Sequence, residues 1–404
     1  MKRLKQDKTL YGISCFALVF YVLVATAGVF VAGIWAYAGI GGAIILSAAL
    51  WAHDKGMPWP EKNLALFALS ALAIMAVETL HSTSPVVSWR EWLKLVTIFV
   101  PLLLLSSPRF DARLLHRNFI ALMLIAVFAG AMALSVELTL GGPLLQAVKG
   151  PGAVLTHYNR GLSFLMILAF PLMAGFLYAD FPLPQKKRWA LVLLFVFVLM
   201  VPAGLTESRA AKLALLLALL TTAMAGLFPI FTRRALAVLA VICVSWPFVV
   251  QKFFLTHYEL LSRFPDSWRA RIEIWDYMSY RIMERPLLGW GLGTAHLLPF
   301  QQPHGDQYTI MSIPAAHPHN VMTELWVELG LPGLALGICF AILILHKAGK
   351  LNARLVPFAL GAWMAAFTLS LVAYDFWTDS LFSAFALAGL LFQMLNKKSA
   401  AGRA

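Results

Sequence analysis

The sequence predicts an all-α, polytopic integral membrane protein with about twelve transmembrane helices and one long external loop that contains short helices. The 404-residue chain is 60% hydrophobic and only 13% charged, and its mean hydropathy is +0.77. No soluble domain of this length has such a composition. Apolar stretches of roughly 20 residues, long enough to cross a hydrocarbon core of about 30 Å, recur along the whole chain. They should be helical, because an unpaired backbone amide costs several kcal/mol in lipid.

The first apolar stretch runs from Leu10 to about Val31 and follows a basic segment that begins at Lys2. It has no convincing cleavage site, so we interpret it as a retained first helix and not as a signal peptide. The candidate spans, in order, are about 10–31, 33–51, 64–80, 92–106, 118–137, 161–179, 189–205, 210–229, 235–254, 321–346, 356–373 and 380–396.

The three cysteines all lie within apolar stretches, and none has a neighbour at metal-ligand or CxxC spacing. They are Cys15, Cys243 and Cys339. The sequence therefore indicates neither a disulfide framework nor a zinc site.

Basic residues predict the orientation of the chain, because cytoplasmic loops carry the excess of Lys and Arg. Twelve spans place both termini on one side, and the loops on that side hold most of the 32 basic residues. We therefore expect both termini to be cytoplasmic. The net charge of +13 is explained by this anchoring, so it does not indicate nucleic-acid binding.

A smaller set of basic residues lies on the predicted external side, against the rule. These residues are Arg90, Lys94, Lys149, Arg160, Arg209, Lys212, Lys252, Arg263, Arg269, Arg271, Arg281 and Arg285. Arg160, Arg209 and Lys212 lie at predicted helix starts, where the helix dipole disfavours a cation. Each therefore needs a compensating anion, either a protein carboxylate or a ligand phosphate.

The external loop divides the chain into residues 1–254 with nine spans, the loop itself at 255–320, and residues 321–404 with three spans and a cytoplasmic tail. The loop is too short for a deep core of its own, so it should pack on the membrane face. Residues 267–284 have an apolar helical face, formed by Ile274, Trp275, Met278 and Ile282. This pattern predicts an interfacial helix with arginines on its other sides, namely Arg271, Arg281 and Arg285.

The interfacial helix should end before Pro286, and a glycine-rich turn follows it. Gly289, Gly291 and Gly293 predict a flexible turn in which the backbone is released from the usual steric limits. The three glycines do not indicate a dinucleotide site, because no strand precedes them and the external side is poor in nucleotides.

A histidine and an asparagine mark the entrance of the tenth span. Pro318 restricts the backbone before it, and Asn320 is a residue type suited to cap a helix. His319 is therefore expected at the boundary between water and hydrocarbon. It is either a functional residue or a satisfied interfacial histidine.

Glu324 and Glu328 follow at i,i+4 spacing and share one face of the same helix. Ionisable groups inside a span cost a few kcal/mol each and are functional-site candidates by default. In the alternative interpretation, the two glutamates pair with external arginines and hold the long loop down.

These residues carry a resemblance to a known family. His319 and Asn320, followed by nine residues and then by Gly330 and Gly333, resemble the His-Asn-x9-Gly-x-x-Gly signature of bacterial O-antigen ligases. Upstream, the segment from Arg209 to Leu213 resembles the Arg-x3-Leu motif of the same ligases.

The resemblance extends over nearly the whole chain. The segments 271–275 and 286–293 resemble the long-loop pattern that ligases share with O-antigen polymerases, and the number of spans and the chain length also match. Two local departures are Glu207, where small residues are common, and the second histidine, His317, two residues before His319.

The resemblance implies glycosyl transfer on the periplasmic side of the bacterial inner membrane. O-antigen ligases move a completed polysaccharide from undecaprenyl pyrophosphate to an outer sugar of the lipid A core. The expected partners are therefore the undecaprenyl pyrophosphate-linked donor, the lipid A core acceptor and membrane lipids. Neither nucleotide, nucleic acid nor cofactor is expected, because the donor carries its own leaving group.

The residues fit this chemistry. A departing pyrophosphate develops negative charge, which arginine stabilises with bidentate, permanently charged donors, and a lysine such as Lys212 adds a point charge. The predicted substrate-binding residues are Arg160, Arg209, Lys212, Arg271, Asn320 and Glu328, and the predicted structural glycines are Gly330 and Gly333.

The acceptor hydroxyl must lose its proton as it attacks, and we expect His319 to be the general base. His317 and Glu328 remain alternative bases. A histidine base predicts a rise in activity near about pH 6–7.

The external side has no DxD-like acidic cluster, so we expect no divalent metal. Since no carboxylate nucleophile is evident, transfer should invert the anomeric centre.

Two other function classes stay open. A polysaccharide polymerase would share the donor chemistry and differ in its acceptor, but the spacing of the His-Asn signature favours a ligase. A transporter would place polar residues and paired broken helices near the middle of the bilayer. In this chain the unusual charges lie at the external ends of the spans.

The charge distribution predicts that the 255–320 loop is periplasmic. A single cysteine introduced at Thr309 in a cysteine-free background should therefore react with an impermeant maleimide in intact spheroplasts. Labelling only after the inner membrane is ruptured would contradict this topology.

Overall fold

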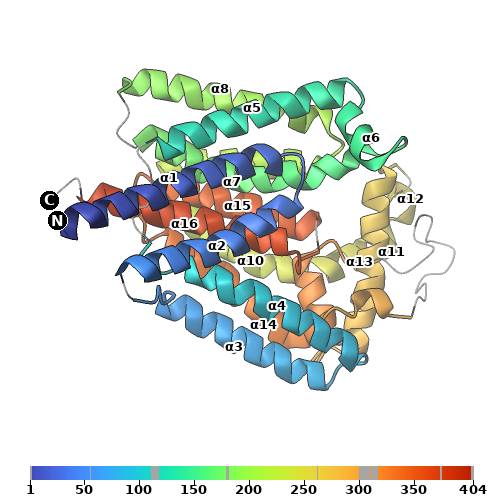
Figure 1. Ribbon diagram of the computed structural model, residues 1–404. Coiled ribbons are helices and arrows are strands. Elements are labelled where there is room, and N and C mark those ends of the chain that lie inside the picture. Colours follow the sequence, from blue (N-terminus) through green and yellow to red (C-terminus); the bar gives the residue numbers. More distant parts are fainter. Residues whose placement is uncertain are drawn as a thin grey trace.

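Long apolar helices run side by side through the body of the protein, and α11 and α13 cross them at one end (Figure 1). The computed structural model describes residues 2–54, 56–110, 118–178, 182–261, 263–299, 310, 317–373 and 375–401. In these ranges every regular element is a helix, which confirms the all-α prediction.

The helices of the bundle are α1 (Lys2–Gly28), α2 (Gly33–Asp54), α3 (Lys62–Leu80), α4 (Pro85–Leu104), α5 (Phe119–Thr139), α7 (Asn159–Tyr178), α8 (Gln185–Leu205), α9 (Arg209–Leu227), α10 (Pro229–Ile242), α14 (Val321–Ala348), α15 (Val356–Val372) and α16 (Asp379–Ala401). The other elements are α6 (Pro143–Lys149), α11 (Trp246–Thr256), α12 (Tyr258–Leu261), α13 (Asp266–Glu284) and the 3₁₀ helices η2 (Leu155–Tyr158), η3 (Cys243–Ser245) and η4 (Ala295–Leu297).

The protein is a multi-pass membrane protein. Among the described residues, ten helical segments are long and apolar enough to cross a bilayer, with α10, η3 and part of α11 counted as one segment. Of the remaining helices, α15 is apolar but has only 17 residues. Three charged residues, Arg90, Glu91 and Lys94, set α4 apart from the apolar helices. The count of twelve spans therefore stays a prediction.

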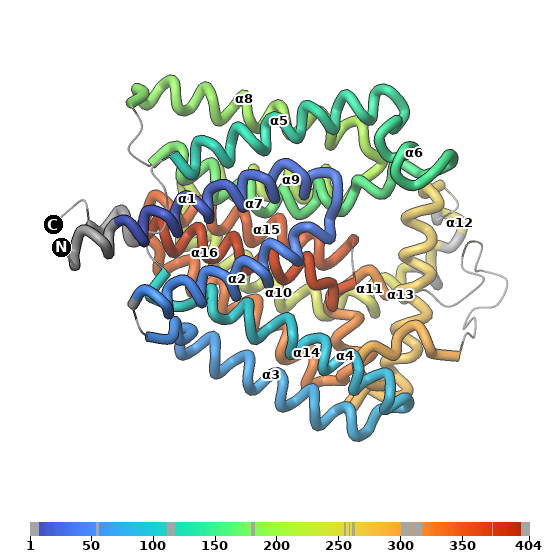
Figure 2. The backbone as a smooth tube through the Cα atoms, in the orientation of Figure 1, coloured from blue at the N-terminus to red at the C-terminus, as the bar shows by residue number. Residues whose placement is uncertain are grey.

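The first and last helices place both chain termini at the same end of the helix bundle. α1 begins and α16 ends at the same end of the bundle, which we call the terminal end (Figures 1 and 2). α13 lies at the opposite end, which we call the loop end. This arrangement agrees with an even number of crossings, while the cytoplasmic location of the terminal end stays a prediction. Residues 300–309, including Thr309, lie outside the described residues.

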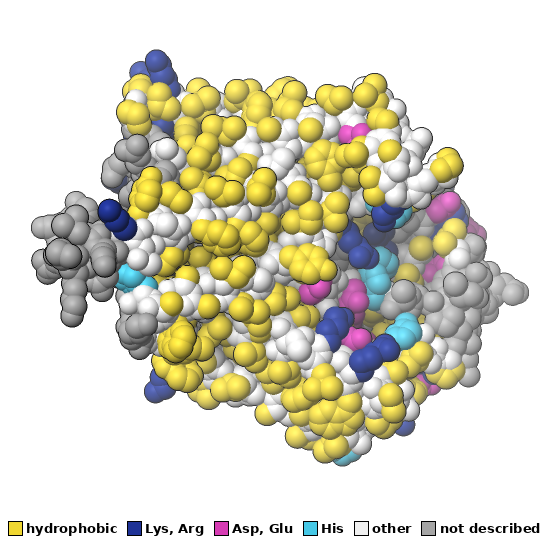
Figure 3. Space-filling view, in the orientation of Figure 1, with side chains coloured by type: hydrophobic (Ala, Val, Ile, Leu, Met, Phe, Trp, Pro, Cys, Tyr) yellow, Lys and Arg dark blue, Asp and Glu magenta, His cyan; other side chains and the backbone are white. Residues whose placement is uncertain are grey.

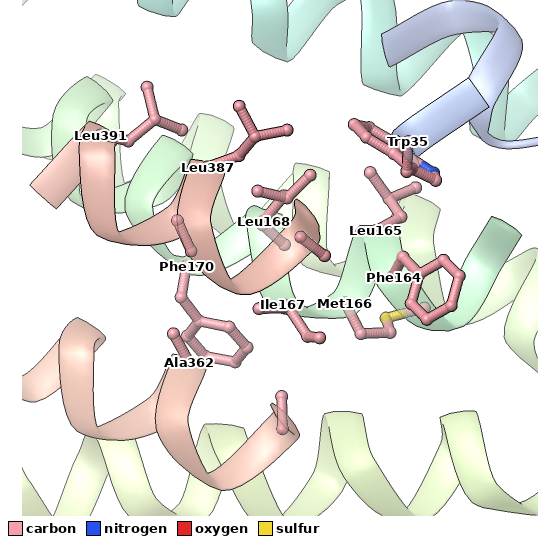
Figure 4. Close-up of a cluster of buried hydrophobic side chains, with 14 of the residues drawn as sticks. Trp35, Phe164, Leu165, Met166, Ile167, Leu168, Phe170, Ala362, Leu387 and Leu391 are labelled. Carbon is pink, nitrogen blue, oxygen red and sulfur yellow. The ribbon is translucent and has the colours of Figure 1, made fainter. Parts of the chain in front are cut away.

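The central helix of the bundle is α7, in which every residue from 161 to 177 is buried. It packs against α5, α8, α9, α15 and α16. Figure 4 shows its apolar side chains between Trp35 of α2, Ala362 of α15 and Leu387 of α16. Because both ends of α7 are fixed by this packing, its first turn holds Arg160 at a defined place at the loop end.

The tenth predicted span, α14, is broken in its middle. Gly330 has φ 64° and ψ −157°, values that are not helical, and Pro332 lacks the N–H that would continue the hydrogen-bond ladder. The amide of Leu331 donates instead to the carbonyl of Pro286, at 3.1 Å. The signature glycines therefore lie at a helix break.

The segment 286–293, which we call the glycine loop, lies against this break. The amide of Trp290 donates to the carbonyl of Val327 at 2.9 Å, and the amide of Gly291 donates to the carbonyl of Glu328 at 2.8 Å. These bonds satisfy two carbonyls that the break leaves without a helical partner, as an apolar environment requires. The three glycines of the loop have positive φ, but the loop is hydrogen-bonded to α14 and is not the flexible turn expected from the sequence.

The helix predicted over residues 267–284 is confirmed as α13, and its predicted apolar face is buried at Ile274, Trp275, Met278 and Ile282, while its location at the membrane interface stays a prediction. The prediction that Arg281 lies on an outer side is wrong, because this side chain is only 3% exposed. Its guanidinium donates to Glu284 at 2.8 Å and to the carbonyl of Pro299, so it ties α13 to the following segment.

Replacing Gly330 by Ala should destabilise the protein. A Cβ at this residue would overlap the Leu287 carbonyl oxygen, and the positive φ disfavours any L side chain. We expect a loss of about 2 kcal/mol or more, seen as a lower thermal transition in fluorescence-detected size exclusion. Gly389→Ala in α16, where a Cβ meets nothing within 4 Å, is the matched control. Equal transitions for both variants would show that the break does not need glycine.

Candidate active site

His319 lies directly before α14 in a conformation that histidine seldom adopts. It has φ 55°, the only positive φ of a non-glycine residue among the described residues. The flanking residues hold it there: Asn320 Oδ1 accepts from the amides of Met322 and Thr323, both at 3.0 Å, and so caps α14 as predicted. On the other side, Trp275 Nε1 donates to the carbonyl of Pro318 at 2.9 Å. Strain of this kind persists only where neighbouring contacts enforce it.

Hydrogen bonds define which nitrogen of His319 is free. Its Nδ1 lies 3.0 Å from the carbonyl oxygen of Ala373. A carbonyl only accepts, so Nδ1 carries the proton, and Nε2 of the neutral ring has the free lone pair. In His317 the situation is reversed, because its Nδ1 accepts the His319 amide at 3.4 Å. The two rings lie 3.9 Å apart between centroids.

Both histidines are neutral at physiological pH. Burial, and then the charges of His317, Arg271 and Arg160, lower the pKa of His319 to about 4. Burial and the charges of Arg160 and Arg271 likewise lower the pKa of His317 to about 4. Since only the neutral ring can accept a proton, His319 is in the form that a general base needs.

Two arginines from distant parts of the chain, Arg160 and Arg271, lie close enough to act on both histidines, and a third, Arg209, lies near Arg271. Arg160 is the second residue of α7, Arg209 is the first residue of α9, and Arg271 lies in the second turn of α13. Nε of Arg271 donates to the carbonyl of Val372 at 3.0 Å, and Nη1 donates to the carbonyl of Ser267 at 2.6 Å. These bonds aim the guanidinium across the end of α15.

The arginines raise the positive potential of the site. Burial and the nearby charge of Arg209 lower the pKa of Arg271, so the two guanidinium groups lie close enough to repel each other. None of the ion pairs found between described residues includes Arg209 or Arg271. Like charges held together without a carboxylate are typical of an anion-binding site.

The fourth predicted cation, Lys212, has a different contact. Its Nζ donates to the carbonyl of Gly204 at 3.2 Å, at the end of α8, and the side chain is exposed. No interaction between Lys212 and either histidine is found among the described residues. The structure thus brings together Arg160, Arg209, Arg271, His317 and His319, and leaves Lys212 at the edge.

Glu328 is buried below the histidines, with 2% of its surface exposed. Its carboxylate accepts from the amide of Gly293 at 2.8 Å, the amide of Ala295 at 3.2 Å and Nε1 of Trp377 at 2.8 Å. It therefore holds the long loop down, but through backbone amides and a tryptophan, whereas the sequence interpretation invoked arginines. With three donors in place, Glu328 is better suited to positioning than to contact with a substrate.

The connection between α15 and α16 completes the site, and the sequence analysis did not single it out. Besides Trp377, this segment supplies the amide of Phe376, which donates to Glu324 at 2.9 Å. The carboxyl groups of Glu324 and Asp375 lie within hydrogen-bonding reach of each other. The only sequence signal was two aspartates and a tryptophan in a short polar break between two spans, residues 373–379.

The surface at the loop end is hollowed. Hydrophobic side chains cover the flank of the bundle, whereas basic, acidic and histidine side chains gather in this hollow (Figure 3). Within the described part of the chain, no group of three or more His, Cys, Asp or Glu side chains is placed to hold a metal ion. Metal independence stays a prediction that chelation can test.

Comparison with known proteins shows that part of this chain is similar to polysaccharide ligases. The family model of O-antigen ligases matches residues 195–338, which include Arg209, Arg271 and the His-Asn pair. A Rickettsia bellii protein assigned as a polysaccharide ligase is 23% identical over 237 residues, covering 54% of this chain and 53% of the relative. A Rickettsia conorii protein with the same assignment is 24% identical over 116 residues, covering 26% of this chain and 27% of the relative. The chain thus spans between about a quarter and a half of the length of these curated relatives.

Replacing Glu328 by Gln should reduce stability and activity together. An amide cannot accept from three donors as the carboxylate does, and a buried unsatisfied group costs about 1–3 kcal/mol. We expect a lower thermal transition for the purified variant. If the transition is unchanged while activity is lost, Glu328 acts on the substrate and not on the loop.

Proposed function

We propose that the chain, whose residues 195–338 match the family model of O-antigen ligases, belongs to this family and is a glycosyltransferase of lipopolysaccharide maturation. It transfers O-antigen polysaccharide from undecaprenyl pyrophosphate to an outer sugar of the lipid A core. The protein lies in the bacterial inner membrane, with both termini in the cytoplasm and the loop end facing the periplasm.

The observation that carries the proposal is the position of Arg160 and Arg271 beside two neutral histidines, with Arg209 close to Arg271. The arginines come from three elements, and together they would hold the diphosphate of the donor. Bidentate donors at fixed positions stabilise the charge of a leaving pyrophosphate more than that of the bound donor.

The reaction is a direct displacement. The acceptor hydroxyl oxygen forms a bond to the anomeric carbon of the donor sugar, and the bond from that carbon to the pyrophosphate oxygen breaks. The hydroxyl proton passes to Nε2 of His319, and the bond's electron pair leaves with the pyrophosphate held by the arginines. Attack from the face opposite the leaving group inverts the anomeric centre. Energy comes from the activated donor, so neither a nucleotide nor a metal enters the reaction.

The remaining predicted residues support this centre. Asn320 fixes His319 by capping α14, Glu328 holds the glycine loop against the break, and Gly330 makes the break possible. Lys212 adds positive charge at the rim of the site.

Reconstitution tests the proposal directly. The purified protein is placed in liposomes with lipid-linked O-antigen and core lipopolysaccharide, in the presence of EDTA and without ATP. A ladder of polysaccharide on the lipid A core supports the ligase. Elongation of the lipid-linked chain would identify a polymerase, and loss of product on chelation that Mg²⁺ restores would contradict metal independence.

The pH dependence should identify the base. With a pKa of about 4 for His319 in the free protein, kcat/KM should rise as pH increases through about 4 and then stay level. The sequence-based expectation of a rise in activity near pH 6–7 used the pKa of an ordinary histidine. It left out burial and the neighbouring arginines, which lower the pKa of His319. A bound pyrophosphate offsets the arginine charge and favours the imidazolium, so the rise in kcat should lie at higher pH than the rise in kcat/KM.

In the same assay, His319→Ala should lower the transfer rate by roughly 10²–10⁴-fold and remove the pH-dependent rise, with donor binding retained. His317→Ala should have a much smaller effect. If His319→Ala keeps most of its activity, another group is the base.

Arg209→Lys and Arg271→Lys keep the charge but lose the planar, bidentate donor. We expect each Lys variant to be expressed normally and to lose most of its transfer activity. Full activity in a Lys variant whose Ala counterpart fails to fold would show that the arginine serves the structure alone.

A further inference from the structure

Two basic residues on α4, Arg90 and Lys94, take no part in the site described above. They lie in the first turns of a helix that packs within the bundle against α2, α3 and α16. Both side chains are exposed. The Nζ of Lys94 pairs with Glu91 at 2.9 Å, and among the described residues no ion pair is found for Arg90. A cation at this depth needs an anion or water, because burial in hydrocarbon costs a few kcal/mol.

The helical spacing places the two bases beside an apolar row. Arg90 and Lys94 are four residues apart and so share one face of α4. Val86, Leu93 and Val100 lie next to them and are 83%, 57% and 49% exposed. The opposite face is buried in the protein, at Ser88, Leu95, Ile98 and Leu102. On the outer face of α4, two basic side chains that can bind an anion therefore lie beside apolar side chains that can contact hydrocarbon. A lipid with a phosphate group and an acyl chain has the complementary chemistry.

Contacts fix the level of this face relative to the active site. The rings of Phe99 in α4 and Phe382 in α16 lie 4.7 Å apart between centroids. Lys94 lies five residues, or about 7.5 Å, toward the loop end from Phe99, and Asp379 lies about 4.5 Å toward the loop end from Phe382. Lys94 is thus within a few ångströms of the level at which the α15–α16 connection contacts Glu324 and Glu328.

α4 is also tied to the glycine loop. Ser88 Oγ donates to the carbonyl of Leu292 at 2.8 Å, and the amide of Thr83 donates to the carbonyl of Trp290 at 2.9 Å. A Cβ at Gly293 would meet Glu91 Cγ at 2.5 Å, so the partner of Lys94 touches the loop that Glu328 holds. The basic face is therefore fixed relative to the active site. It lies on a different side of the bundle from α9, which packs against α7, α8, α10 and α15.

We propose that the outer face of α4, with Arg90 and Lys94 beside Leu93 and Val100, binds the phosphate and acyl chain of a lipid, and that this lipid carries the acceptor sugar. The second part rests on the proposed function. A transferase with two lipid-borne substrates must hold both at once, and the arginines at the starts of α7 and α9 and in α13 already serve the donor pyrophosphate. The α4 face gives the second lipid a place of its own at the same level of the membrane.

Photolabelling tests the binding face without any need for transfer. The full-length protein in phosphatidylcholine nanodiscs receives a small fraction of phosphatidic acid with a diazirine in its acyl chain, and labelled peptides are quantified after irradiation. We expect saturable labelling of residues 85–104 that falls about fivefold or more in the double variant Arg90→Gln, Lys94→Gln. Lys252→Gln, which removes an exposed base from α11 at the loop end, is the matched control and should label as the parent does.

The outcomes of the labelling are separable. Labelling that rises in proportion to the lipid and ignores the double variant would show ordinary contact with bulk lipid and overturn the site. Labelling that millimolar inorganic phosphate abolishes would show a site for the free ion, which also overturns a lipid site. If the double variant does not fold, Arg90→Gln alone leaves the ion pair of Lys94 with Glu91 intact and gives the same test.

Transfer kinetics test the assignment to the acceptor. The double variant should raise the KM for core lipopolysaccharide roughly tenfold and leave kcat and the KM for the lipid-linked donor nearly unchanged. A rise in the donor KM would assign the face to the donor and overturn the proposal. If the parent protein itself shows no transfer, the proposed function and the acceptor assignment fail together, while the labelling still decides whether α4 binds a phosphate-bearing lipid.

Discussion

The break in α14 at Gly330 is the constraint on which the rest of the site depends. An interrupted helix in an apolar environment leaves backbone carbonyls without donors, and the glycine loop supplies those donors to Val327 and Glu328. The loop can approach so closely only because its glycines have positive φ. The same contact brings the amides of Gly293 and Ala295 to the Glu328 carboxylate. A helix break thus fastens the long external segment to the membrane bundle.

The same hydrogen-bonded unit continues to His319, the proposed base. Glu328 also accepts from Trp377, and the preceding end of α15 offers the Ala373 carbonyl that sets the tautomer of His319. His319 is itself part of the entrance to α14, three residues before Met322, whose amide donates to Asn320 Oδ1. The histidine is therefore oriented from both sides by groups that belong to one hydrogen-bonded unit, and its rare backbone conformation is a consequence of this arrangement.

Electrostatics complement this geometry. Arg160, Arg209 and Arg271 lie at or near helix starts, where the helix dipoles favour an anion, and the charges of Arg209 and Arg271 repel each other. Burial, together with the charges of Arg160 and Arg271, lowers the pKa of both histidines and keeps them neutral. A diphosphate bound here, as we propose, would offset the repulsion between the guanidinium groups and raise the pKa of His319.

The sequence by itself determined the features that depend on local physics. Hydrophobic length predicted the helices, periodicity predicted the buried face of α13, and residue type predicted the cap at Asn320. It also placed the cations at helix starts. Tertiary structure decided the rest: that Arg281 is buried, that Glu328 is bonded to amides and not to arginines, and that Trp377 and Asp375 lie at the site. Those facts depend on contacts between segments far apart in the chain, and no periodicity or composition within one segment encodes which partner it meets.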